Sequence, residues 1–195
     1  MLERAILARH AESESNAANV LNGDPKLRVP LTERGRDQAR ELRAVIDGED
    51  IRAVITSEFP RAIETADLAV GHRNLPTVVV AELNDPRGGA WEGMDLDEYL
   101  AWAAASDPAD APPDGESLRE VLARVATALR VILARTEQAV LVIGHGLPIS
   151  TVLAAAEADL DERSVYPPVP NAEPFVLTRR QLEIAAGRIE RAVDP

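Results

Sequence analysis

Cysteine is absent from the 195-residue chain, which excludes disulfide bonds, thiol catalysis and cysteine-ligated zinc sites. Aromatic residues make up only 3% of the sequence, so the core must be built mainly from alanine, valine, leucine and isoleucine. No apolar run approaches about 18 residues, the length expected of a membrane-spanning helix, and we recognise no signal peptide. These absences predict a cytoplasmic protein.

Basic residues are also scarce, because 21 Lys and Arg stand against 33 Asp and Glu and give a formal net charge of −12. Such a chain repels nucleic acid and anionic membranes unless a local basic patch overrides its field. An acidic protein can still bind a small phosphorylated molecule if a few arginines converge in one pocket. The length and even composition predict one domain over residues 1–195.

Apolar runs alternate with segments of helical spacing along the chain. Four runs rich in valine and isoleucine predict buried strands: Ala5–Ala8, Ala53–Thr56, Thr77–Val80 and Ala139–Ile143. Helices are expected from Thr32, over about Pro60–Ala69, over about Asp95–Ala104, from Ser117 and over about Leu147–Ala156. The alternation predicts an α/β fold, a three-layer αβα sandwich with a mostly parallel central sheet and helices on both faces.

Some finer expectations concern packing and the C-terminal third. The inward-facing positions should include Ala39, Leu42, Val45 and Ile46 in one helix and Leu96, Tyr99 and Leu100 in another. Phe175–Thr178 and Leu182–Ala185 are expected to form a late strand pair at one edge of the sheet, in antiparallel orientation. Pro167, Pro168 and Pro170 mark a loop that could cover a pocket or contact another subunit.

Polar side chains gather where the predicted strands end, which is where open α/β sheets bind their ligands. The four strands are followed in turn by Arg9 and His10, by Arg61, by Glu82 and Asp85, and by His145 between two glycines. Two of the three histidines, two arginines and two acids therefore share one rim. The third histidine, His72, lies in a polar turn and is expected to be exposed and without a role.

Each residue of this group also has a plainer interpretation. An Arg-His pair can be an ordinary surface feature, and Gly144-His145-Gly146 can be a simple strand-to-helix turn. Arg61 can pair with Glu58 or Glu64 along a helix. Two histidines and a carboxylate can also form a metal site, although the fixed positive charge of the arginines would repel a cation.

The combination suits phosphoryl transfer. Arginine presents planar, bidentate donors that match phosphate oxygens, and a neutral imidazole is a competent nucleophile near pH 7. A second histidine can donate to the oxygens in transfer, and a carboxylic acid can protonate the leaving alkoxide. The group of residues therefore predicts a phosphoryl-transfer site.

The order of several short motifs resembles the histidine phosphatase superfamily, which includes cofactor-dependent phosphoglycerate mutases and many small phosphatases. The matching segments are Arg9-His10-Ala11-Glu12-Ser13 with Asn16, Gly23-Asp24, Pro30 to Gly35, Ser57, Arg61 to Ala66, Gly89 to Gly93, Asp114 to Ser117 and Ile143 to Gly146. The resemblance implies that His10 is the phosphorylated nucleophile and that Arg9 and Arg61 clamp the phosphate. His145 would complete the pocket, Asn16 would contact phosphate, and no metal or cofactor is implied.

The resemblance leaves the acid open between two residues. Counting back from Trp91 to the position at which the family commonly has its acid reaches Asp85, which is our first choice, with Glu82 as the alternative. The chain also departs from the family pattern at two places. Ala11 replaces the usual glycine and could crowd the phosphate or stiffen the loop, and Phe59-Pro60 precedes Arg61.

Three functions remain open at this point. A phosphomonoesterase is favoured, because the chain is short and residues 85–115 supply only a small cap. A phosphoglycerate-type mutase would need more cations at the rim, where only Lys26, Arg28 and Arg87 are available. A catalytically silent domain that binds a phosphorylated ligand or a partner is the third. The substrate is a small phosphorylated molecule whose organic part the sequence does not identify, and a homodimer is suggested by the resemblance alone.

Overall fold

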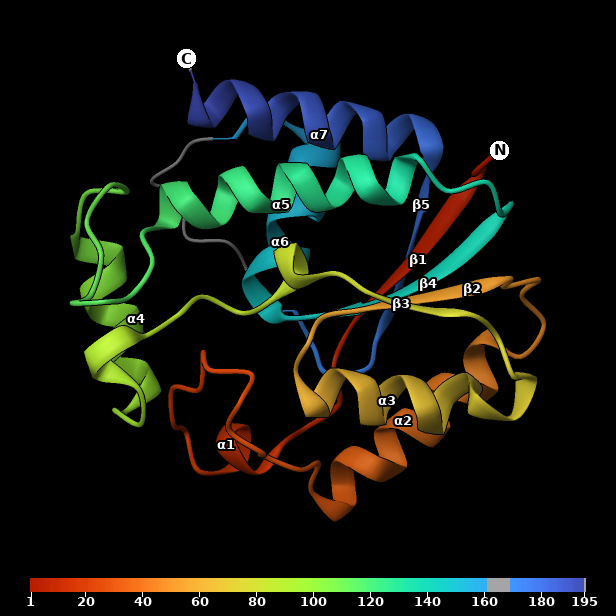
Figure 1. Cartoon of the computed structure of the whole chain (residues 1–195), viewed down its shortest axis with the longest axis horizontal. Helices are drawn as coiled ribbons and strands as arrows, with labels where there is room; N and C mark the ends of the chain where they lie inside the picture. Colours follow the sequence, from red (N-terminus) through yellow and green to blue (C-terminus); the bar gives the residue numbers. More distant parts are fainter. Residues whose placement is uncertain (161–168, 195) are drawn as a thin grey trace.

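A sheet of five strands organises the computed structural model, which describes residues 1–160 and 169–194 (Figure 1). The strands are β1 (Arg4–Arg9), β2 (Ala53–Thr56), β3 (Thr77–Val79), β4 (Ala139–Gly144) and β5 (Pro174–Thr178). Their order is β3-β2-β4-β1-β5, with every neighbouring pair parallel except β1 and β5. The mostly parallel sheet predicted from the sequence is therefore confirmed.

Residues 5–8, 53–55 and 139–143 of the central strands are apolar, as expected for strands with both faces buried. In β1, Ala5 and Leu7 belong to one hydrophobic cluster, whereas Ile6 and Ala8 belong to the other. The same alternation holds in β2 and β4, as expected for side chains that point to opposite faces of a strand in turn. Each face thus supplies an apolar surface that a helical layer must cover.

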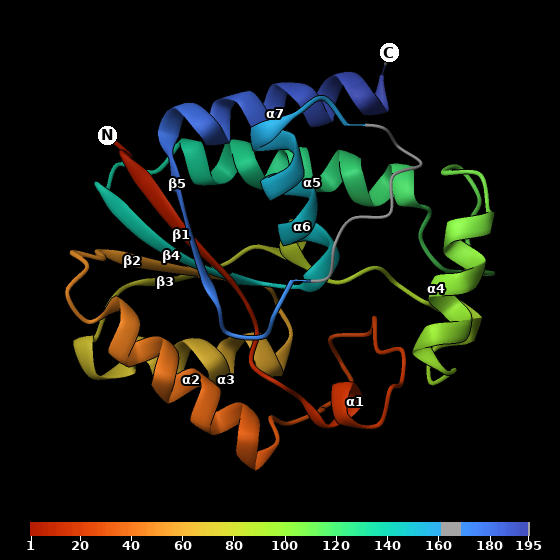
Figure 2. The ribbon, with the colours of Figure 1, turned by 180° about the vertical axis from the view of Figure 1, so that it is seen from behind.

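Helices cover both faces and form the outer layers (Figures 1 and 2). One layer contains α2 (Glu33–Ile46) and α3 (Pro60–Val70), and the other contains α5 (Leu118–Leu133), α6 (Gly146–Glu157) and α7 (Arg179–Val193). Thr32 caps α2 by accepting from Gly35 N, and Ser117 begins α5 with a capping box. The three-layer prediction and both of these helix starts are confirmed.

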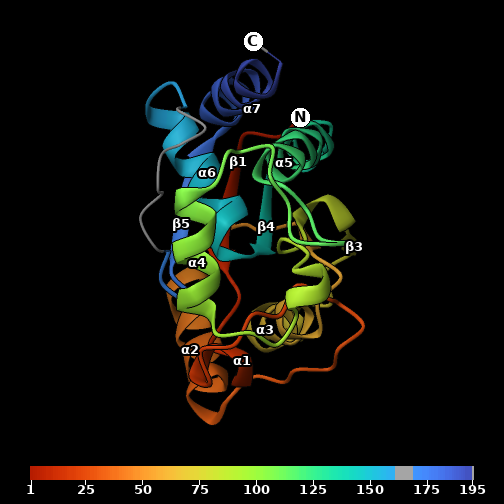
Figure 3. The ribbon, with the colours of Figure 1, turned by 90° about the vertical axis from the view of Figure 1, so that its left-hand side faces the viewer.

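Shorter elements lie mainly at the carboxyl ends of the parallel strands. They are α1 (Glu14–Ala17), α4 (Leu96–Ala105) and the 3-10 turns η1 (Gly71–Arg73), η2 (Ala81–Leu83) and η3 (Gly89–Trp91). Figure 3 looks at the molecule from the side toward which the parallel strands run, and α4 stands in front of the sheet in that view. No helix within the described ranges is long and apolar enough to cross a membrane.

Four expectations about individual segments are wrong. Thr77–Val80 is expected to be a buried strand, but β3 leaves Thr77 and Val79 exposed because it lies at the edge of the sheet and pairs with β2 alone. Leu182–Ala185 lies in α7 and not in a strand, because Leu182, Ala185, Ala186 and Ile189 recur at helical spacing and Thr178 caps the helix. Val45 and Leu100 are exposed, at 67% and 53%, since each lies beside the buried stripe of its helix and not on it.

The remaining calls on the C-terminal third have separate outcomes. Phe175–Thr178 does form an edge strand, β5, antiparallel to β1. His72 is exposed in η1, as expected. Pro167 and Pro168 lie outside the described residues.

Candidate active site

The sheet brings His10 and His145 side by side. Arg9, the last residue of β1, is in register with Gly144, the last residue of β4, and each is followed by a histidine. The backbone N–H of His10 donates to Gly144 O at 2.9 Å. The two imidazole rings meet edge to face with their centroids 5.1 Å apart, and both side chains are buried. Adjacent parallel strands thus account for this pair.

Hydrogen bonds assign the tautomer of His10. Its Nδ1–H donates to the carbonyl of Ala11 at 2.7 Å, which leaves the lone pair on Nε2. That lone pair accepts from Nε of Arg61 at 3.0 Å. Burial lowers the pKa of His10 well below 6.5, and the charges of Arg61 and Arg9 lower it further. The imidazole is therefore neutral, with Nε2 available as a nucleophile.

Ala11 fits its position without a positive φ angle. Its methyl group is fully buried in the hydrophobic cluster on the α2–α3 side of the sheet, with Ile6 and Leu31 among its members. Its backbone N–H donates to the Thr65 hydroxyl at 3.0 Å. The alanine is thus accommodated in the core, and its carbonyl remains free to hold His10.

Arg61 is the most highly connected side chain of the site. Pro60 occupies the first turn of α3, where a missing N–H costs nothing, and Arg61 follows it. Besides His10, the guanidinium of Arg61 donates to Oδ1 and O of Asn22, to Asp85 Oδ2 at 3.1 Å and to Nδ1 of His145 at 3.3 Å. A planar group with several donors can link these acceptors, which a lysine could not do.

The ring of Phe59 packs against the guanidinium of Arg61. The guanidinium carbon of Arg61 lies 4.2 Å from the centroid of the Phe59 ring, a cation–π distance. The same ring meets His145 edge to face at 4.5 Å. The departure from the family pattern at residue 59 therefore supplies a platform shared by two residues of the site.

Arg9 has one donor without a partner among residues 1–160 and 169–194. Its Nη1 donates to the carbonyl of Val169 at 3.0 Å, whereas its Nε is buried without a hydrogen-bond partner within the described residues. Burial lowers the pKa of Arg9, but a guanidinium remains charged at neutral pH. A buried, unsatisfied N–H on a cation is suited to an anionic oxygen.

His145 is held between Ser57 and Arg61. Because its Nδ1 accepts from Arg61, its Nε2 carries the proton and donates to the Ser57 hydroxyl at 2.8 Å. Burial lowers the pKa of His145 well below 6.5, with Arg61, His10 and other charges adding to the effect. The residue is also the N-cap of α6, so the positive end of that helix dipole points toward the pair of histidines.

The two candidate acids are placed differently. The carboxylate of Asp85 contacts Arg61 and lies 3.5 Å from Nδ1 of His145. Burial raises the pKa of Asp85, and the charges of Arg61, Arg9 and Arg124 offset part of that rise. Glu82 joins this region through its backbone carbonyl, which accepts from Arg124. The contacts favour Asp85 as the proton donor.

Asn16 is not among the contacts that join the two histidines and Arg61. Its Oδ1 accepts from the backbone and hydroxyl of Ser13 and so caps the short helix α1. Its role in binding phosphate stays a prediction. The sequence interpretation gave no catalytic-site role to Asn22, Ser57 or Asn171, which donates to the His10 carbonyl at 2.7 Å. Ser57 directly follows β2, and this position at the end of a strand was the available signal for that residue.

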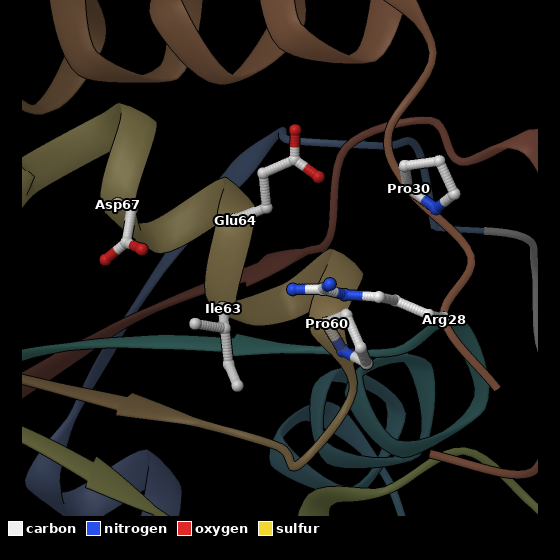
Figure 4. A pocket seen from close by; sticks show the side chains of 6 residues that line it. All are labelled: Arg28, Pro30, Pro60, Ile63, Glu64 and Asp67. Atoms are coloured by element: carbon white, nitrogen blue, oxygen red, sulfur yellow. The ribbon is translucent and has the colours of Figure 1, made fainter. Parts of the chain in front are cut away.

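A groove of about 530 Å³ lies on the half-exposed side of α3 (Figure 4). Arg28 reaches across the start of that helix, and the other lining residues are Pro30, Pro60, Ile63, Glu64 and Asp67. None of the residues that surround His10 lines this groove. In the part of the chain that the structure describes, no cluster of three or more histidine and carboxylate side chains could hold a metal ion.

The sequence profile of the histidine phosphatase superfamily (branch 1) matches residues 5–186. The adenosylcobalamin/alpha-ribazole phosphatase of Escherichia coli (strain K12) is 31% identical over 160 residues, which cover 77% of each chain. The 2,3-bisphosphoglycerate-dependent phosphoglycerate mutase of Methylobacterium sp. (strain 4-46) is 36% identical over 158 residues, covering 72% of this chain and 74% of the mutase. The solved structure of Bacillus stearothermophilus YhfR superposes with a TM-score of 0.78 at 29% identity, covering 89% of both chains.

Proposed function

The chain belongs to the histidine phosphatase superfamily, and we propose that it is a phosphomonoesterase that forms a phosphohistidine on His10. The observation that carries the proposal is the pair of hydrogen bonds at this residue. The Ala11 carbonyl fixes the proton on Nδ1, and the unprotonated Nε2 faces Arg61 at 3.0 Å. A nucleophilic nitrogen is thus aligned beside the cation that would bind the phosphate.

In the first step, Nε2 of His10 attacks phosphorus and the P–O bond to the organic group breaks. The phosphate oxygens would take over the donors of Arg61 and the unpartnered Nε of Arg9. Asp85 would give its proton to the leaving alkoxide, since its raised pKa favours the protonated acid that this step needs. The products are an alcohol, phosphohistidine and an Asp85 carboxylate.

In the second step, water attacks the phosphohistidine from the side that the alcohol has left. The Asp85 carboxylate accepts a proton from this water, the P–N bond breaks, and Nε2 regains its lone pair. His145 would donate its Nε2–H, now shared with Ser57, toward the oxygens in transfer. Inorganic phosphate leaves, and both His10 and Asp85 return to their starting protonation states.

The charge of the segment over the site favours hydrolysis over the mutase reaction. Between residues 86 and 115 the basic side chain is that of Arg87, against seven carboxylates: Glu92, Asp95, Asp97, Glu98, Asp107, Asp110 and Asp114. Arg28, another candidate cation, lines the groove on α3 with Glu64 and Asp67. A bisphosphorylated intermediate would meet repulsion from this segment, whereas a singly phosphorylated ester need not.

We also propose that residues 1–195 form one domain in which residues 85–115 cap the site. The position of α4 in front of the strand ends supports the cap (Figure 3). A cytoplasmic location and a homodimer stay predictions, which cell fractionation and light scattering would test.

The test is hydrolysis of 4-nitrophenyl phosphate and a panel of alkyl phosphates in the presence of EDTA. We expect turnover by the wild-type chain, unchanged by the chelator, and none by the His10→Ala variant with its fold retained. A matched pair within the panel is glycerol 3-phosphate and 3-phosphoglycerate, which differ by a carboxylate in place of a hydroxymethyl group. The first should be the better substrate because the acidic cap repels the added charge.

Other results would change the assignment. Near wild-type turnover by His10→Ala removes the nucleophile, and loss of activity with EDTA revives a metal site. Isomerisation of phosphoglycerate faster than hydrolysis would make the chain a mutase. No turnover of any phosphate ester, with no isomerisation, would leave the silent binding domain.

A further inference from the structure

The segment that carries Asp85 is held in place by an arginine from a distant part of the chain. Arg124, on α5, donates through Nη1 to the carbonyl of Glu82 at 3.0 Å and to the carbonyl of Asn84 at 2.5 Å. Asn84 directly precedes Asp85, in a stretch between η2 and η3 that has no helix or strand of its own. The backbone in front of the proposed acid is therefore fixed by a side chain.

Glu116 completes the attachment on the other side of Asp85. Its two carboxylate oxygens accept from Nε and Nη2 of Arg124 at 2.7 and 3.0 Å, a bidentate ion pair. Its own backbone N–H donates to the carbonyl of Arg87 at 3.0 Å, and its Oε2 accepts from Arg87 N at 3.4 Å. The pair thus contacts the chain both before and after Asp85.

The pair is shielded from water, which strengthens its hold. The side chain of Arg124 is 17% exposed and that of Glu116 is 8% exposed. A guanidinium can serve two carbonyls and a carboxylate at once because its five N–H donors lie in one plane. Removal of either partner would leave a largely buried charge unpaired and two chain segments unconnected.

We propose that Arg124 and Glu116 are positioning residues that hold the Asp85 carboxylate at the distance from which it can protonate the leaving group. The inference rests on the proposed function, in which Asp85 is the general acid. Neither residue needs to touch the substrate. Because proton transfer depends on hydrogen-bond distance, a displacement of about 1 Å is enough to lower a rate by roughly 100-fold.

A second ion pair on α5 supplies a matched control. Arg130 forms a bidentate pair with Glu190 of α7, at 2.7 and 2.6 Å, on the same helix as Arg124. This pair joins two outer helices and is half-exposed, so Arg130→Gln removes a similar interaction without touching the Asp85 segment. We expect that variant to keep the wild-type rates on all esters.

The experiment compares kcat/KM for glycerol 3-phosphate, whose alkoxide needs a proton, with that for 4-nitrophenyl phosphate, whose leaving group hardly does. We expect Arg124→Gln to lower the first at least about tenfold and the second less than about threefold, because general acid catalysis assists only poor leaving groups. Arg124→Lys should fall between, since one ammonium cannot span all of these acceptors.

A double-mutant cycle separates positioning from a merely structural effect. In the Asp85→Asn background, Arg124→Gln should cause little further loss on glycerol 3-phosphate, because the acid through which it acts is already gone. Equal losses on both esters, or full additivity with Asp85→Asn, would overturn the inference. If Arg124→Gln fails to fold, the variant that also carries Glu116→Gln removes both charges, and the same selective loss is expected.

The wild-type and His10→Ala proteins test the proposed function separately from the positioning role of Arg124. Turnover of both esters by the wild-type chain, lost in His10→Ala, tests the phosphatase assignment before any variant of Arg124 is compared. A selective loss in Arg130→Gln equal to that in Arg124→Gln would also count against positioning, since it would show a general effect of weakening α5.

Discussion

His10 and His145 stand directly at the ends of buried strands and Arg61 stands in the first turn of a helix, whereas Asp85 stands on an irregular segment between two 3-10 turns. The first three side chains are at most 3% exposed, but that of Asp85 is 29% exposed. The proposed phosphate-binding half of the site is therefore part of the sheet and its helices, whereas the proposed acid lies on a loop outside them.

The two halves of the proposed site are therefore held in place by different interactions. His10 and Arg9 are positioned by the parallel pairing of β1 with β4, which cannot slip without exposing the core, and Arg61 is positioned by the first turn of α3. The acid depends on one ion pair and on its contact with Arg61. Changes in the first half should affect all phosphate esters, whereas changes in the second should depend on the leaving group.

Loss of Arg61 should give the largest effect of the following variants. We expect Arg61→Gln to lower kcat/KM by about 10³-fold for aryl esters and at least as much for alkyl esters, because charge on the transferred phosphoryl group loses a buried cation and Asp85 loses a partner. Steady-state kinetics on both esters measure this. The control is Arg73→Gln, which removes another largely buried arginine that donates to backbone carbonyls away from the site. A loss confined to alkyl esters would show that Arg61 acts only through Asp85 and does not bind the phosphoryl group.

Asp85→Asn should lower the rate on alkyl esters much more than the rate on aryl esters. We expect a loss of about 10²-fold on alkyl phosphates and a small loss on 4-nitrophenyl phosphate, since only the former need a proton donor. Glu82→Gln is the matched control and should keep both rates. A larger selective loss from Glu82→Gln than from Asp85→Asn would transfer the role of the acid to Glu82.

The pH dependence should separate the two halves in a single enzyme. His10 must be unprotonated, and its pKa is lowered, so kcat/KM rises with pH in a limb that lies below 6.5. Asp85 must be protonated, and its pKa is raised, so the rate on alkyl esters falls with pH in a limb that lies above 3.8. Both limbs report the coupled site.

Asp85→Asn should remove the basic limb and leave the acid limb in place. The measurement is a pH profile of kcat/KM on glycerol 3-phosphate for both proteins. An acid limb above pH 6.5 would show that His10 is not held neutral by its surroundings.

Phe59→Leu should have the smallest effect on kcat/KM of these variants. Leucine keeps the core filled but removes the ring on which Arg61 rests, a cation–π contact of about 1 kcal/mol. We expect kcat/KM to fall about fivefold, the rate equivalent of about 1 kcal/mol, with the same factor for aryl and alkyl esters. Phe175, a half-buried phenylalanine in β5, offers Phe175→Leu as the control. A larger loss on alkyl esters than on aryl esters would show that the Phe59 ring acts through Asp85 and not through phosphate binding by Arg61.

The halves also differ in how well the sequence predicts them. The apolar segments Ala5–Ala8, Ala53–Thr56 and Ala139–Ile143 are predictable because strands buried on both faces have continuous apolar sequences. The meeting of His10 and His145 at one rim follows from parallel topology alone. Their ring spacing, tautomers and the unsatisfied Nε of Arg9 depend on side-chain packing, which spacing along the chain does not encode.

The position of Asp85 depends on contacts between residues that are far apart in the sequence. Arg124 lies 40 residues after Asn84 and sits in a helix whose pattern predicts only packing. Likewise, Leu182–Ala185 carries a short apolar pattern compatible with a strand, and the helical spacing appears only when the pattern is followed from the Thr178 cap to Ile189. Local patterns describe elements, and tertiary contacts decide between alternatives.

The most direct test of the account is to quench the reaction during turnover of a labelled phosphate ester and to map the label on the protein. We predict an acid-labile, base-stable phosphoryl group on His10, which is absent from the His10→Ala variant. The label should accumulate whenever hydrolysis of the phosphohistidine is slower than its formation. Hydrolysis that proceeds with no phosphorylated protein, or with the label on a residue other than His10, would contradict the central claim.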